Sequence, residues 1–160
     1  RSHNDSAAPR VLMGKRSGRH VFMPDKYVFP GGRVDPPDGR VPALSELNPR
    51  THALLKQYTR RTTRAFALTA IRETFEETGW HIRNPRRLGA FRRYAYMPEY
   101  DLWAEKICLI YIATPTLKIG PPTEPAHQAI WMEPKVAQDL LGAAGDRHFA
   151  ALLAKSIIRG

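Results

Sequence analysis

The sequence has one cysteine, Cys108, and no apolar run that approaches the roughly 20 residues needed to span a bilayer. A lone cysteine can form no internal disulfide, so we expect Cys108 to be a buried packing residue in a protein of the reducing cytoplasm. Zinc-type Cys/His spacing, a Walker loop and internal repeats are also missing. Within these 160 residues the absences exclude a disulfide scaffold, a membrane-spanning helix, a P-loop and a solenoid.

Acidic residues are scarce, at 15 Asp and Glu against 25 Lys and Arg, and the net charge is +10. Such an excess raises the local concentration of anionic partners. The length of 160 residues, 42% of them hydrophobic, predicts a single domain over residues 1–160. Residues 1–9 are polar and begin with Arg1 instead of Met, so we expect them to be flexible and to follow a trimmed start.

Hydrophobic periodicity and turn residues predict a mixture of helices and strands. Strands are predicted over 10–16, 27–29, 87–96, 106–113 and 128–132, the fourth of them as a buried strand. Helices are predicted from Asn48-Pro49 onward, over 64–78 with Thr62 or Thr63 as its cap, and as a closing pair within 134–158. The proline-rich segment 114–125 is predicted to be a loop.

Three of the few acidic residues fall in one turn of the helix predicted over 64–78. Glu73, Glu76 and Glu77 stand at i, i+3 and i+4 and therefore share one face, where their charges repel one another. A hard divalent cation such as Mg²⁺ or Mn²⁺ would relieve that repulsion, because it prefers carboxylate oxygens. Taken alone, the pattern also fits a solvated helix face that ends in the glycine cap Gly79.

A glycine-containing run, Phe29–Asp35, precedes this helix, and its Gly31-Gly32 pair allows a close approach of the backbone to a ligand or to the helix. The run and the acidic helix together resemble the Nudix box, G-x5-E-x7-R-E-U-x-E-E-x-G-U, in which U is a bulky apolar residue. The matching residues are Gly32, Arg72, Glu73, Glu76, Glu77, Gly79 and Trp80.

The sequence departs from this pattern in three places. Asp38 stands where the first glutamate of the box is expected, and Thr74 stands at the first apolar position. The seven-residue spacer has become the segment from Gly39 to Ile71, so we expect an insertion over 39–64. The Asn48-Pro49 pair predicts that the insertion is helical. Because the insertion lies inside the box and therefore against the expected active site, we expect it to shape substrate choice.

The resemblance implies an α+β fold, a Nudix-like α/β/α sandwich with a mixed central sheet and the helical insertion inside the box. It also implies a site that holds Mg²⁺ or Mn²⁺ through Glu73, Glu76, Glu77 and Gly32. Glu73 would position or deprotonate the attacking water, and Arg72 would orient Glu76. Glu124, on the predicted loop before the last strand, is a candidate further ligand or base.

The implied reaction is hydrolysis of the diphosphate linkage in a nucleoside diphosphate joined to another moiety. Basic residues near the box are candidates for binding the substrate, namely Arg33, Arg60, Arg61 and Arg64. Candidate substrates are coenzyme A esters, ADP-sugars, dinucleotides and nucleoside triphosphates, and the start of the box resembles that of coenzyme A diphosphatases. We expect a small-molecule partner, no membrane partner and a homodimer as a possible assembly.

A noncatalytic nucleotide sensor or nucleic-acid-binding regulator is the alternative, because the fold hosts such modules and the chain is basic. The intact set of glutamates favours the enzyme. The sequence also shows no basic stripe interleaved with aromatic residues, so nucleic acid is a disfavoured partner.

Overall fold

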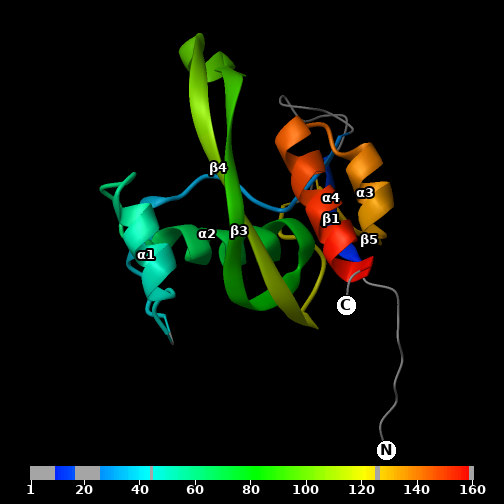
Figure 1. Ribbon diagram of the computed structural model, residues 1–160, viewed down its shortest axis with the longest axis horizontal. Coiled ribbons are helices and arrows are strands. Elements are labelled where there is room, and N and C mark those ends of the chain that lie inside the picture. The colour runs from blue at the N-terminus through cyan, green and yellow to red at the C-terminus, as the bar shows by residue number, and fades with distance from the viewer. Residues whose placement is uncertain (1–9, 17–25, 44, 125–126, 159–160) are drawn as a thin grey trace, which may run out of the picture. The chain divides into compact units, whose positions relative to one another are not determined.

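The computed structural model describes residues 10–16, 26–43, 45–124 and 127–158 (Figure 1). Residues 1–9, for which we predicted flexibility, lie outside the described residues. The described residues pack as two compact units, the first formed by those up to Phe29 together with those from His127 onward, and the second by those from Pro30 to Glu124. The predicted functional residues all belong to the second unit.

The first unit is a small antiparallel sheet with two helices. β1 (Val11–Arg16) lies between β2 (Tyr27–Val28) and β5 (His127–Met132), with Met13 opposite Ile130 in the register of β1 and β5. The predicted closing pair of helices is confirmed as α3 (Pro134–Leu140) and α4 (Ala144–Ile158). Apolar side chains from both layers form its core, namely Met13, Met132, Ala137, Leu141 and Ala150.

The second unit is organised by α2 (Arg64–Thr78), which packs against a long antiparallel hairpin (Figure 1). The hairpin consists of β3 (Trp80–Met97) and β4 (Leu102–Lys118), joined by the short 3-10 turn η2 (Pro98–Tyr100). A second 3-10 turn, η1 (Pro36–Gly39), follows the segment that contains Gly31 and Gly32, which we call the glycine loop, and packs on α2. The insertion contains α1 (Pro49–Lys56), which confirms its predicted helical character.

Local chemistry explains where α1 begins and where α2 ends. Asn48 caps α1, because its side-chain oxygen accepts a hydrogen bond of 2.9 Å from the Arg50 N–H, with Pro49 at the first helical position. α2 ends at Gly79, which has a φ of 73° and donates its N–H to the Phe75 carbonyl at 2.7 Å. The left-handed conformation favours glycine, as the sequence predicted.

Thr63 takes the N-cap position of α2, but its hydroxyl does not cap the helix. The hydroxyl oxygen lies 2.8 Å from Nδ1 of His52 in α1. The predicted threonine cap is therefore wrong as a hydrogen bond, because the side chain joins the insertion to the start of α2 instead.

Two predictions about β4 are corrected. Residues 114–118, predicted as loop, continue the strand because they pair with the segment Trp80–Arg83 at the start of β3. Residues 106–113, predicted as a buried strand, are half-buried or exposed, and Ile107 is 60% exposed. Cys108 is accordingly half-buried instead of buried.

The predicted α+β class is confirmed. In the described residues the named strands form two antiparallel sheets, whereas the sequence predicted a mixed central sheet. Within the described part of the first unit, an isolated parallel bridge also joins Tyr27 of β2 to Leu141, which follows α3.

Candidate active site

The acidic face of α2 is turned inward instead of being a solvated surface. Glu73 and Glu77 are buried, with 8% and 3% of their surface exposed, and Glu76 is half-buried. Burying carboxylates is unfavourable unless cations or hydrogen-bond donors surround them. The arrangement therefore requires specific partners for each of the three.

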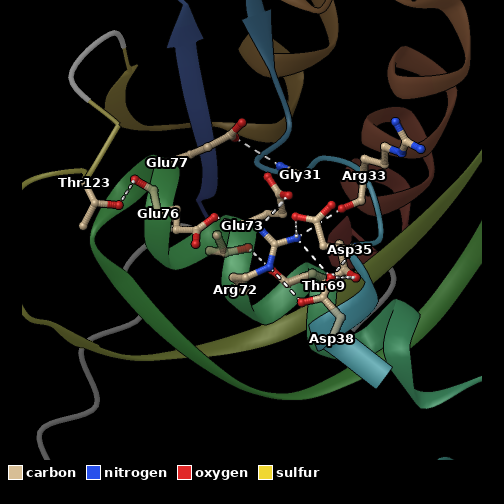
Figure 2. Close-up of polar contacts among 12 residues, drawn as sticks. Gly31, Arg33, Asp35, Asp38, Thr69, Arg72, Glu73, Glu76, Glu77 and Thr123 are labelled. Atoms are coloured by element: carbon tan, nitrogen blue, oxygen red, sulfur yellow. Dashed lines mark hydrogen bonds and ion pairs between the residues drawn. The ribbon is translucent and has the colours of Figure 1, made fainter. Parts of the chain in front are cut away.

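Arg72 is the cationic partner of two of these glutamates and lies between carboxylates of α2 and of η1 (Figure 2). Its Nη1 contacts Glu76 Oε2 at 2.8 Å and Glu73 Oε1 at 2.9 Å. Its Nε and Nη2 donate to the two oxygens of Asp38, at 2.8 and 3.0 Å. Nη2 also donates to the Arg33 carbonyl at 3.1 Å and lies 3.5 Å from Asp35 Oδ2. The geometry agrees with a side chain that orients Glu76.

Asp38 anchors this guanidinium from η1. It is 3% exposed, and besides Arg72 it accepts hydrogen bonds from the Thr69 hydroxyl at 2.7 Å and the Asp35 N–H at 2.9 Å. The hydrogen bonds from Arg72 lower the pKa of Asp38 to about 2 against the opposing effect of burial, and the same pairing raises the pKa of Arg72. The sequence analysis aligned Asp38 with the first glutamate of the box but did not predict that it would bind Arg72. Its alignment with a box position was the one feature of the sequence that could have indicated a role for Asp38 in the site.

The glycine loop fits closely against the acidic helix face. A side chain at Gly32 would overlap the Glu73 carboxylate, so glycine is required for this approach. The neighbouring Gly31 donates its N–H to Glu77 Oε2 at 3.1 Å, as Figure 2 shows. Gly32 and Glu73 are thus neighbours, and the hydrogen bond from Gly31 ties Glu77 to the loop backbone.

Glu124 reaches the same place from the far end of β4. A helix leaves its last carbonyls without intrahelical partners, and the Glu76 carbonyl accepts instead from the N–H groups of Thr123 and Glu124, at 2.9 and 3.2 Å. The Thr123 hydroxyl adds a third bond at 3.3 Å. These bonds hold residue 124 beside the end of α2, forty-odd positions away in sequence.

Glu73, Glu76 and Glu124 therefore form an acidic trio in which one oxygen of each lies within 4.8 Å of the others. Burial raises the pKa of Glu73, and the charges of Glu76 and Glu124 add to the rise, while Arg72 opposes it. Three converging carboxylates with only part of their charge balanced by Arg72 fit a hard divalent cation, which prefers oxygen ligands. The donor set suits Mg²⁺ or Mn²⁺ better than a soft metal.

The predicted substrate-binding arginines fall into three different settings. Arg33 uses its carbonyl to hold Arg72 and is itself exposed. Arg64 pairs with Glu46 of the insertion at 3.0 Å, so part of its charge is engaged within the protein. Arg60 and Arg61 are exposed and line a hollow that also includes Asp35.

A model of the NUDIX domain matches residues 3–153 of the 160-residue chain. The chain belongs to the NUDIX family. The match covers the glycine loop, η1, the insertion, α2 and Glu124, so the predicted family is confirmed for nearly the whole chain. The NUDIX family is one of pyrophosphohydrolases that act on small nucleotide-linked substrates and generally use divalent metals.

No curated protein matched this NUDIX chain. Its described residues contain no helix with the length and apolar character needed to cross a membrane.

Proposed function

We propose that this NUDIX protein is a metal-dependent hydrolase that cleaves the diphosphate linkage of a nucleoside diphosphate joined to another moiety. The observation that carries the proposal is the acidic trio beside Gly32, because it converges oxygen ligands where the family pattern expects a divalent cation. Glu73 and Glu76 would hold Mg²⁺ or Mn²⁺ together with Glu124, and the Gly32 backbone and Glu77 complete the predicted ligand set. When bound, such a cation would neutralise charge on the diphosphate and its leaving group.

The protein's own residues would position the other reactants. Glu73 lies under the glycine loop and is our candidate for orienting or deprotonating the attacking water, with Glu124 as the neighbouring carboxylate that can share this task. Arg72 is a positioning residue, because its guanidinium is engaged by Asp38, Glu73 and Glu76. The exposed Arg33 is the proposed contact for substrate phosphate.

The substrate would be one of the four classes that the sequence suggested, namely coenzyme A esters, ADP-sugars, dinucleotides and nucleoside triphosphates. The resemblance of the box to that of coenzyme A diphosphatases supports the first class. The excess of basic residues supports an anionic substrate in each case.

The test measures release of phosphorylated products from a panel of these substrates with Mg²⁺ and with Mn²⁺. Glu76→Gln, Glu77→Gln and Glu124→Gln should each lower turnover by about 10²-fold or more, and chelator should abolish it. Mn²⁺ binding, followed by electron paramagnetic resonance, should weaken in the same variants. Glu99→Gln is the matched control, because Glu99 is exposed in η2 at the tip of the hairpin.

Full turnover in both Glu76→Gln and Glu77→Gln would refute the ligand assignment. Tight binding of a nucleotide or RNA without any product would instead favour a noncatalytic sensor or regulator. Thermal midpoints close to the wild-type value would show that loss of turnover in a variant is not loss of fold.

A further inference from the structure

The hollow lined by Arg60 and Arg61 lies within the second unit and contains none of the three acidic residues of the trio in its lining. It has a volume of about 250 Å³ and is lined by Val34–Pro36, Gly39 and Arg40 on one side and by Arg60–Thr62 and Ala65 on the other. Three arginines line it, Arg40, Arg60 and Arg61, and we call it the arginine pocket. Typical ligand pockets span about 300–1,000 Å³, so its size suits one group of a ligand and not a whole nucleotide.

The charge of the arginine pocket is strongly positive. Arg40, Arg60 and Arg61 form no ion pair with any residue that the structure describes, and all three are exposed. The one acid in the lining, Asp35, lies 3.5 Å from Arg72 and shares its charge with that side chain. Three positive charges around a hollow repel one another. An anion placed between them would be attracted to all three and would offset that repulsion.

The arginine pocket is coupled to the acidic trio through Asp35 and Arg72. Asp35 lines the pocket and pairs with Arg72, which in turn contacts Glu73 and Glu76. Two side chains, Asp35 and Arg72, therefore link the arginine pocket to the acidic trio. Both places therefore belong to one connected set of side chains within the second unit, which a single substrate could contact.

We propose that the arginine pocket binds a phosphate monoester carried by the substrate in addition to its diphosphate. A phosphate monoester has a charge of about −1.5 to −2 and three acceptor oxygens, which match several guanidinium groups better than a single carboxylate does. The proposal rests on the proposed function and narrows it to substrates with a separate phosphate. The insertion, by supplying Arg60 and Arg61, would thereby set the specificity.

Two pairs of compounds test this directly, because each pair differs by one phosphate monoester: coenzyme A with 3′-dephospho-coenzyme A, and NADP⁺ with NAD⁺. The wild type should prefer the phosphorylated member of at least one pair by about tenfold or more in kcat/KM. The variant Arg60→Ala/Arg61→Ala should reduce that ratio to near one. Arg83→Ala/Arg86→Ala is the control, because it removes two exposed arginines from β3 and should leave the ratio and the activity unchanged.

A binding measurement without metal separates this proposal from the proposed function. In chelator, adenosine 3′,5′-bisphosphate should bind the wild type about tenfold more tightly than AMP in calorimetry, and the Arg60/Arg61 variant should lose the difference. If the difference in binding is present but turnover is absent with every substrate, the proposed function fails and the arginine pocket stands. If both pairs are hydrolysed without preference, or if the arginine variant weakens both members of a pair equally, the arginine pocket is overturned.

Discussion

Replacement of Asp38 by asparagine tests the anchor of the candidate site. The carboxylate accepts four hydrogen bonds, two from Arg72, one from the Thr69 hydroxyl and one from the Asp35 N–H. Asparagine has nearly the same shape but only one acceptor oxygen, so at least one guanidinium donor loses its partner. It also removes the negative charge opposite Arg72.

The magnitude follows from the pKa of Asp38, which is about 2 against an ordinary 3.8. That difference corresponds to about 2 kcal/mol of charge-dependent stability, reduced to about 1–2 because Arg72 is partly exposed to solvent. A buried donor left unpaired adds about 1 kcal/mol. We therefore expect Asp38→Asn to lower the free energy of unfolding by about 2–3 kcal/mol at pH 6.

The pH dependence gives the sign of the effect. A carboxyl whose pKa is lower in the folded state stabilises the fold above its unfolded pKa, and this contribution is lost as the pH falls through the folded pKa. The difference in the free energy of unfolding between wild type and Asp38→Asn should be largest at pH 6 and should decrease between pH 4 and 2. Urea unfolding followed by circular dichroism measures it, with Asp139→Asn on an exposed position of α3 as control. A gap that is absent at pH 6, or that stays constant down to pH 2, would refute the ion-pair account.

Two glycine substitutions probe the rest of the site. Gly32→Ala places a methyl group on the Glu73 carboxylate, so we expect kcat to fall by about 10²-fold in the product-release assay; Gly120→Ala, where a side chain meets nothing within 4 Å, should retain wild-type activity. Gly79→Ala forces a left-handed φ on alanine and overlaps the Gly120 carbonyl, so unfolding should become easier by at least about 2 kcal/mol; an unchanged urea midpoint would contradict a left-handed end of α2 at this residue.

The sequence predicted those parts of the structure that local chemistry determines. The span of α2, its end at Gly79 and the cap of α1 at Asn48 follow from periodicity, glycine and capping residues that are visible in a short window. The grouping of the carboxylates on α2 also follows from helical spacing alone. The fourth acid, Glu124, was identified only through the family resemblance, because its position depends on backbone bonds to Glu76.

Contacts between distant segments were not predictable in this way. The role of Asp38 depends on its meeting Arg72, thirty-four positions later, and no local pattern encodes that meeting. The length of β4 was underestimated because Pro115 and the following residues resemble a loop until they pair with β3. The hydroxyl of Thr63 was assigned to a cap because His52 is remote in sequence.

The first and last residues of the insertion lie close together, near the start of α2. A side-chain carbon at Gly39 would lie 3.6 Å from the Thr62 hydroxyl and 3.8 Å from Ala65. The chain therefore leaves at Gly39 and returns at Thr62 to almost the same point, as the ends of a loop do. Doubling the length of a flexible loop with fixed ends costs only about 0.6 kcal/mol in closure entropy. Segments of other lengths and sequences could therefore be grafted between residues 39 and 62 while the ion pairs of Arg72 with Asp38, Glu73 and Glu76 stay in place.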